Sequence, residues 1–241
     1  MNNASNTIVK SYGEELRHLR ELLARMGGLA ERQVADAAQA LVQRDAAAAG
    51  EVVGRDGPID ALEREVEAYC VRMLALRSPM AADLRLIIAA MKASQDLERI
   101  GDYARNAAKR AIVVSQQPSL GGVVTSFAAM AQLVQRNLKD AIDALVNDDA
   151  EAAERVWNND APVDDVYNGI FRQVLTYMME DPRNITASTH LLFIAKNFER
   201  IGDHATNIAE TVFYAVRGVT LPEERPKADT SHSAVVRVPA G

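Results

Sequence analysis

The chain has 241 residues, which is enough to bury one large hydrophobic core or two small ones. Hydrophobic residues make up 48% of it and aromatic residues only 5%, a balance that favours helices over sheets. The net charge of -6, from 27 basic and 33 acidic residues, excludes a general attraction to nucleic acid.

The N-terminal residues lack the basic start and the apolar stretch of a signal peptide, so we expect a short tail over residues 1–13. A single cysteine, Cys70, can form no internal disulfide, which favours a reducing compartment. We therefore expect a cytoplasmic protein without direct membrane insertion.

Helix-breaking residues divide the rest of the chain into helical stretches. We expect helices over about 14–44, 46–53, 57–77 and 79–114, a linker over 116–122, and the same plan from 124 to 217. Beyond Gly218 the pattern stops, and the segment 219–241, with its prolines and charges, is predicted to be a disordered tail.

The sequence repeats itself. At an offset of 104 residues, the segment 40–60 matches the segment 144–164 without a gap, with 11 of 21 positions identical. At an offset of 101, the segment 97–108 matches 198–209 with eight of twelve identical, and both contain Glu-Arg-Ile-Gly-Asp. Two blocks in the same order indicate a duplicated unit.

Each unit is long enough for three helices of roughly thirty residues, which can bury a core when they pack together. The predicted fold is therefore all-α, with two tandem three-helix bundles over residues 14–117 and 118–218.

The Glu-Arg-Ile-Gly-Asp segments lie on helices with an apolar stripe at spacings of three and four. The stripe comprises Ala90, Ala93, Leu97, Ile100, Ala104, Ala107 and Ala111 in the first unit, and Leu191, Ile194, Phe198, Ile201, Ala205, Ile208 and Val212 in the second. At about 100° per residue, the polar side chains Glu98, Asp102 and Asn106, and likewise Glu199, Asp203 and Asn207, point away from this stripe and outward together.

A second acidic pair begins the preceding helix of each unit: Asp56 with Asp60, and Asp160 with Asp164. Carboxylates four residues apart on a helix repel each other unless a cation lies between them. Oxygen ligands suit iron, Mn²⁺ or Mg²⁺, and Zn²⁺ also accepts carboxylates. One interpretation is thus a metal site on each unit, with Asn106, Asn207, Asp36 and Asp140 as weaker candidate ligands.

The simpler interpretation is a solvated acidic face. Arg99, Arg105 and Lys109 lie near Glu98 and Asp102 as possible partners, and Asp56 before Gly-Pro could cap a helix. The sequence alone leaves both interpretations open. It also contains no glycine-rich phosphate loop, nucleophile elbow or Glu-x-x-His pair, so we expect no enzyme and no catalytic residues.

The doubled Glu-Arg-Ile-Gly-Asp, the Asp-x-Pro-Ile/Val-Asp segments, and the segments 78–85 and 175–181 together resemble the PhoU family of bacterial phosphate-transport accessory proteins. The resemblance covers about residues 10–218. It implies two three-helix bundles, often dimeric, that bind metal through Glu98 with Asp102 and Glu199 with Asp203, supported by Asp56, Asp60, Asp160 and Asp164.

The resemblance also implies a regulator of phosphate homeostasis. Its expected partners are the ATPase subunit of the high-affinity phosphate importer and a sensor histidine kinase, and it is expected to repress the phosphate-starvation response when phosphate is plentiful. The alternatives are a metal-buffering or storage protein without a signalling partner, and a helical interaction module whose acids carry no metal.

Overall fold

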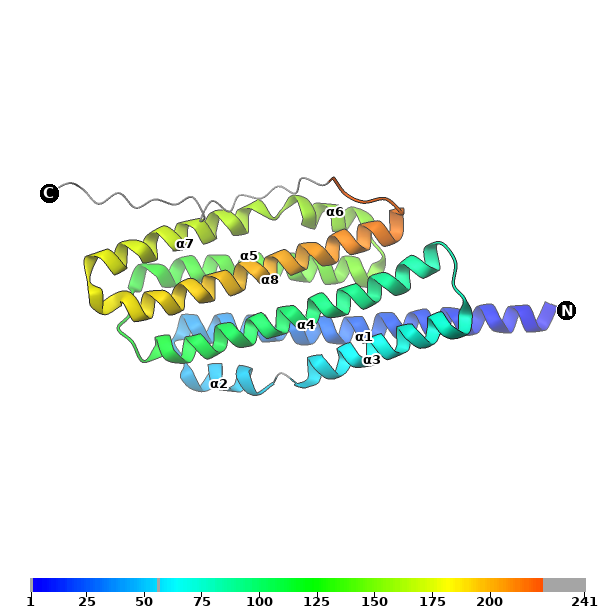
Figure 1. The fold of residues 1–241 in the computed structure, drawn as a ribbon, viewed down its shortest axis with the longest axis horizontal. Coiled ribbons are helices and arrows are strands. Elements are labelled where there is room, and N and C mark those ends of the chain that lie inside the picture. Colours follow the sequence, from blue (N-terminus) through cyan, green and yellow to red (C-terminus); the bar gives the residue numbers. More distant parts are fainter. Residues whose placement is uncertain (1, 56, 223–241) are drawn as a thin grey trace.

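The computed structural model describes residues 2–55 and 57–222, and within them every regular element is a helix (Figure 1). The helices are α1 (Asn2–Gln43), α2 (Ala46–Gly54), α3 (Gly57–Arg77), α4 (Ala82–Ser115), α5 (Gly121–Asn147), α6 (Ala150–Asn158), α7 (Ala161–Glu180), the 3₁₀ turn η1 (Pro182–Asn184) and α8 (Ile185–Arg217). None of these helices is both long and apolar enough to cross a membrane. The part of the predicted tail from 223 to 241 lies outside the described residues.

Three helix starts differ from the expected ones, and one of them is that of α5, which begins at Gly121 within the expected linker and not at residue 124. The first helix begins at Asn2 and not near Glu14, because residues 2–12 contain neither proline nor glycine to stop an existing helix from extending. Helix α4 begins at Ala82 and not at Pro79, because Ser78 and Ala81 have φ angles of 45° and 49°, outside the right-handed helical region.

Each repeat is a three-helix bundle whose middle member is broken in two. In the first repeat this middle member, which we call the arm, consists of α2 and α3 and packs against α1 and α4. In the second repeat the arm consists of α6 and α7, which pack in the same way against α5 and α8 (Figure 1). The short helices begin at equivalent N-caps: Asp45 Oδ1 accepts from Ala47 and Ala48, and Asp149 Oδ1 from Glu151 and Ala152. The predicted pair of three-helix bundles is confirmed.

The apolar stripes predicted on the two motif helices are buried throughout. On α4 the stripe is mostly alanine, whereas on α8 it carries Phe198 and several isoleucines. Small side chains allow helices to approach closely, and α4 and α8 make the most extensive contact in the molecule. The two stripes therefore serve both the core of each repeat and the contact between repeats.

The repeats pack through α4 against α8 and through α1 against α5 (Figure 1). Helices α4 and α8 are antiparallel, since Arg85 near the start of α4 donates to the carbonyl of Ala215 near the end of α8, at 3.2 Å. Midway along this contact, His204 of α8 pairs with Asp96 of α4 at 2.7 Å. His204 is thus a half-buried contact between the repeats.

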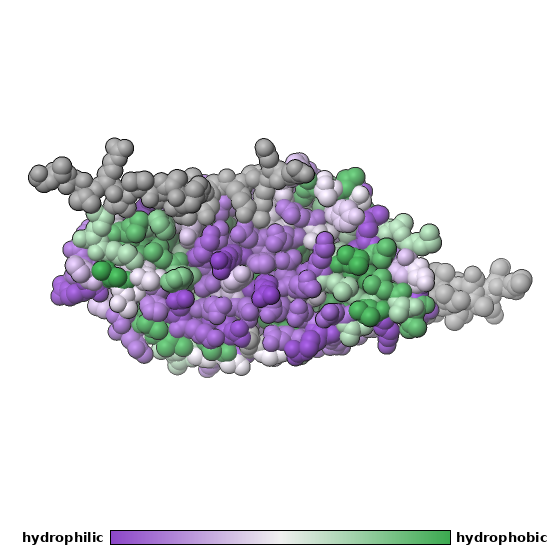
Figure 2. Space-filling view, viewed as in Figure 1, coloured by the Kyte–Doolittle hydropathy of each residue, from purple (hydrophilic) through white to green (hydrophobic). Residues whose placement is uncertain are grey.

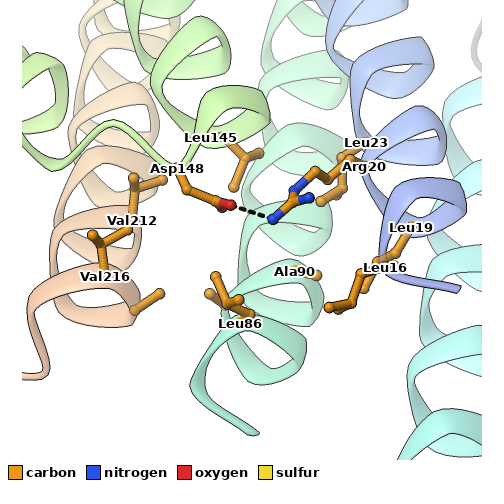
Figure 3. A pocket seen from close by; sticks show the side chains of 12 residues that line it. Leu16, Leu19, Arg20, Leu23, Leu86, Ala90, Leu145, Asp148, Val212 and Val216 are labelled. Atoms are coloured by element: carbon orange, nitrogen blue, oxygen red, sulfur yellow. Dashed lines mark hydrogen bonds and ion pairs between the residues drawn. The ribbon is translucent and has the colours of Figure 1, made fainter. Parts of the chain in front are cut away.

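One end of the contact between repeats contains a small apolar cavity (Figure 3). Leu19 and Leu23 of α1, Leu86 of α4 and Val212 of α8 line it, and an ion pair between Arg20 and Asp148 closes one side. Asp148 is the C-cap of α5, with φ of 52°. The pair therefore joins α1 to the end of α5, the first helices of the two repeats.

Candidate functional site

The two repeated sequence motifs meet in each repeat. A Cβ added to Gly101 would lie 2.9 Å from Cδ1 of Ile59, and one added to Gly202 would lie 3.4 Å from Cγ1 of Val163. Ile59 and Val163 are equivalent residues of the Asp-x-Pro-Ile/Val-Asp segments at the starts of α3 and α7. The glycine of Glu-Arg-Ile-Gly-Asp therefore admits the apolar residue of the arm helix, and this contact brings the acidic residues of both motifs together.

The first acidic cluster comprises Asp60 and Glu63 from α3 and Glu98 and Asp102 from α4. All four side chains are partly buried. Burial, with the nearby negative charges of Asp102, Glu63 and Asp60, raises the pKa of Glu98. These effects show that carboxylates from two helices share one region. Asp56, which the sequence adds to this group, lies outside the described residues.

The second acidic cluster comprises Asp160 and Asp164 from α7 and Glu199 and Asp203 from α8. It is more enclosed, since Asp160 and Asp164 are each 3% exposed and Glu199 is 5% exposed. The expectation that these acids point outward together is wrong for Glu199, because the arm helix α7 covers it. Burial, with the charges of Asp203 and Asp164, raises the pKa of Glu199, and a hydrogen bond from Lys196 partly opposes the shift.

Asp160 stands at the N-cap position of α7 but makes no side-chain cap hydrogen bond. Its Oδ1 instead accepts a hydrogen bond from Thr206 of α8 at 3.2 Å. Asp160 therefore does not cap α7 with its side chain, which belongs to the cluster. The capping interpretation of Asp56 lies outside the described residues.

Basic side chains of the chain itself contact both clusters. In the first, Arg105 Nη2 donates to Asp102 Oδ1 at 2.6 Å, and Arg99 lies 3.5 Å from Glu98. In the second, Lys196 Nζ donates to Glu199 Oε1 at 2.8 Å. Arg99 is largely exposed, whereas Arg105 and Lys196 lie partly within the protein.

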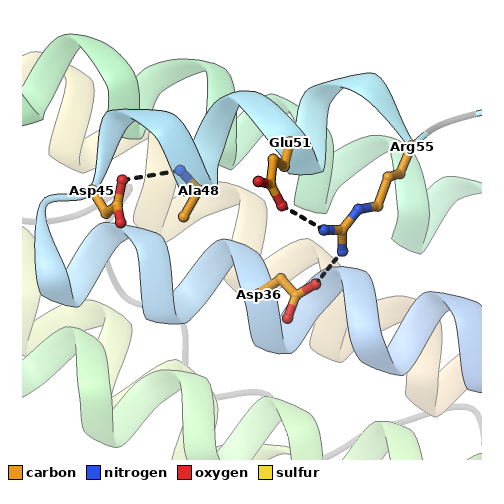
Figure 4. A network of polar contacts seen from close by, with 5 residues as sticks. All are labelled: Asp36, Asp45, Ala48, Glu51 and Arg55. Atoms are coloured by element: carbon orange, nitrogen blue, oxygen red, sulfur yellow. Dashed lines mark hydrogen bonds and ion pairs between the residues drawn. The ribbon is translucent and has the colours of Figure 1, made fainter.

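The weaker candidates lie elsewhere or contribute less. Asn106 and Asn207 are half-buried, one helical turn beyond Asp102 and Asp203. Asp36 accepts a hydrogen bond from Arg55 at 2.7 Å, and Arg55 also contacts Glu51 (Figure 4). Asp140, its counterpart on α5, is exposed and lines a polar groove between α5 and α6.

Hard cations need several carboxylate or carbonyl oxygens turned toward one point. Among the described residues, no group of three or more His, Cys, Asp or Glu side chains has this arrangement. Asp102 and Glu199 each direct an oxygen at a basic side chain of the protein instead. As arranged, the described side chains of the two clusters do not fit a metal ion, and Asp56 lies outside them. The expected iron, manganese, magnesium or zinc stays a prediction.

The sequence-based prediction missed Glu63 and Lys196 and treated Arg105 only as a possible surface partner. These three residues stand where the repeats differ: their counterparts are Tyr167, Gln95 and Thr206. A search for identical positions passes over them. The signal that could have found them is a change of charge between the two copies beside an unchanged acidic motif.

Comparison with known proteins places the chain in a family. The PhoU domain matches the sequence twice, over residues 23–111 and 127–212. The chain belongs to the PhoU family. The two PhoU domains coincide with the two three-helix repeats, and both acidic clusters lie within them.

Several PhoU proteins are similar over nearly their whole length. A protein of Caulobacter vibrioides named phosphate-specific transport system accessory protein PhoU homolog is 51% identical over 221 residues, covering 92% of this chain and 96% of the relative. A Rhizobium meliloti protein of the same name is 44% identical over 222 residues, covering 92% and 94%.

Two solved structures share the fold. The crystal structure of PhoU from Pseudomonas aeruginosa has a TM-score of 0.83 and 42% identity, covering 86% of this chain and all of that one. That of the phosphate transport system regulatory protein PhoU from Streptococcus pneumoniae has a TM-score of 0.79 and 27% identity, covering 88% and 99%.

Proposed function

We propose that this chain is a cytoplasmic regulator of phosphate homeostasis that acts as an adaptor without catalysis. It contacts the ATPase subunit of the phosphate importer and a sensor histidine kinase, and it represses phosphate uptake and the starvation response when phosphate is plentiful. The observation that carries this proposal is the near full-length similarity to accessory proteins of the phosphate-specific transport system.

The surface supports an adaptor with two docking regions. Figure 2 shows a hydrophilic middle and apolar regions toward both ends of the viewed face. The first end patch comprises Leu76, Met80, Leu84 and Ile88, around the connection between α3 and α4. The second comprises Met179 and Ile185, around the connection between α7 and α8, at the opposite end of the molecule (Figure 1).

These side chains are more exposed than a lone protein ordinarily requires. Leu76 is 70% exposed and Met80 is 80% exposed. Grouped apolar side chains at the surface are typical of protein contacts, because covering them removes apolar area from water. Two patches on one rigid helical body allow an ATPase and a kinase to be held by different ends, so that the occupancy of one partner can bias the other.

Binding measurements with purified partners test the proposal. The affinity of the chain for the importer ATPase and for the cytoplasmic part of the kinase is measured by calorimetry. We expect the double substitution Leu76→Ser with Met80→Ser to weaken binding of one partner, and Met179→Ser with Ile185→Ser to weaken binding of the other, each by about tenfold or more.

Gln132→Ser, on the exposed face of α5, is the matched control and should leave both affinities unchanged. Failure of the unaltered chain to bind either protein would contradict the adaptor. The same samples give the mass in solution, for which the proposal expects a homodimer.

A further inference from the structure

We propose that Arg105 and Lys196 are built-in cations of the two acidic clusters, neutralising carboxylates at the place where a metal ion would otherwise bind. The proposal goes beyond the adaptor function, because it concerns what holds the clusters together and does not depend on any partner.

The placement of Lys196 carries the argument for the second cluster. Its ammonium lies 2.8 Å from Glu199 Oε1 and 5.0 Å from the centre of the Tyr167 ring. Glu199 belongs to α8 and Tyr167 to α7, so the ammonium lies between these two helices. A cation over an aromatic face and beside a buried carboxylate is favourably placed for both groups.

Glu199 needs such a partner. Its side chain is only 6% exposed, and its Oε2 is buried without a hydrogen-bond partner. An ionised carboxylate in this position is costly unless a positive charge is close. The negative charges of Asp164 and Asp203 add to the cost. Lys196 supplies the positive charge that the cluster requires.

The first cluster reaches the same result with a different residue. Arg105 Nη2 donates to Asp102 Oδ1 at 2.6 Å, and both side chains are about one quarter exposed. Arg105 follows Asp102 by three residues, whereas Lys196 precedes Glu199 by three. The second repeat has Thr206 in place of Arg105, and the first has Gln95 in place of Lys196.

The different positions of the basic residues in the two repeats support the proposal independently. Each copy places a basic residue where the other has an uncharged polar one, and each basic residue contacts an acid of the shared motif. A basic side chain that served only solubility would extend into water and would not contact the carboxylates of the cluster. The two repeats thus neutralise clustered carboxylates with basic residues at different positions. This indicates that the fold requires a positive charge beside the acids and not a particular side chain.

The test exchanges residues between the repeats. Lys196→Gln and Arg105→Thr give each copy the residue that the other already carries. After treatment with a chelator, Mn²⁺ binding is measured by calorimetry and the melting temperature is recorded with and without Mn²⁺. We expect the unaltered chain to bind Mn²⁺ weakly and to melt at the same temperature with and without it.

Each exchange variant should melt lower without Mn²⁺, recover on its addition, and bind it at least about tenfold more tightly than the unaltered chain, because one opposing charge is gone from beside the acids. Lys196→Arg keeps the charge and should behave like the unaltered chain. Lys109→Gln, which removes a positive charge at an exposed position on α4, should also do so.

Two results would overturn the proposal. The first is tight, stoichiometric Mn²⁺ binding by the unaltered chain that Asp102→Asn or Asp203→Asn abolishes. The second is an exchange variant that is destabilised but gains no affinity for Mn²⁺. The measurement on the unaltered chain decides the question even if one variant fails to fold, and the two clusters give independent answers.

Discussion

Substituting the helical glycines by alanine distinguishes sites where helices touch closely from sites where they do not. Gly202, Gly101 and Gly27 each face another helix, and the space beside them differs. An added Cβ would lie 3.4 Å from Val163 at Gly202, 2.9 Å from the flexible end of Ile59 at Gly101, and 2.8 Å from Cγ2 of Ile142 at Gly27.

The magnitudes follow from two opposing effects. Alanine in place of glycine within a helix stabilises by about 1 kcal/mol. At Gly202 the methyl group makes an ordinary contact, so Gly202→Ala should stabilise by about 1 kcal/mol. At Gly27 it meets the β-branched side chain of Ile142, and overpacking costs about 1–3 kcal/mol. Gly27→Ala should therefore be neutral or destabilise by up to about 2 kcal/mol, with Gly101→Ala between the two.

Urea unfolding followed by circular dichroism measures this order. Gly169→Ala is the control, because this glycine lies within α7 with nothing within 4 Å of the added Cβ. This substitution measures only the effect of the higher helix propensity of alanine, and it should stabilise the protein by as much as Gly202→Ala. If Gly202→Ala instead lowered the free energy of unfolding by about 1 kcal/mol or more, the added methyl group would clash with Val163, which contradicts the 3.4 Å spacing at this contact.

Three further outcomes are expected. Asp45→Ala and Asp149→Ala, at equivalent N-caps of α2 and α6, should each reduce the free energy of unfolding by about 1 kcal/mol in urea titrations, and unequal losses would show that the short helices are not equivalent. Because the pKa of Glu98 is raised in the folded protein, ionisation of this carboxyl costs stability as the pH rises above the ordinary glutamate value of 4.5. Glu98→Gln should therefore raise the urea midpoint at pH 7 and leave it unchanged at pH 4. Equal effects at both pH values would contradict the burial of this carboxyl. Burial raises the pKa of the Cys70 thiol to about 12, so a colorimetric thiol reagent at pH 8 should react with it only after urea unfolding, and rapid reaction of the folded protein would contradict its position in the core.

Most of the fold could be predicted because it depends on local patterns. The three-four stripe around Leu97 and Phe198 gave the buried face of each motif helix, and the duplication gave the number of bundles. The start of α4 could not be predicted, because the positive φ at Ser78 and Ala81 depends on how the chain turns between packed helices.

The acidic site was predictable only in part. Four-residue spacing placed Glu98 with Asp102 on one line of a helix, but it could not show that an arm helix covers the equivalent Glu199. Burial of a polar face depends on which helix packs over it, and a periodicity in one segment carries no information about that. Lys196 could not be predicted for the same reason, because its position in the cluster depends on contacts with both Glu199 and Tyr167.

The most direct test of the adaptor is complementation. A bacterial strain that lacks its own PhoU protein is given this chain, and a reporter of the phosphate-starvation response is measured in phosphate-rich medium. The unaltered chain should restore repression, whereas substitution of Leu76 and Met80 by serine should leave the reporter active although the protein accumulates normally. Full repression by variants of both end patches, or none by the unaltered chain in a strain with compatible partners, would contradict it.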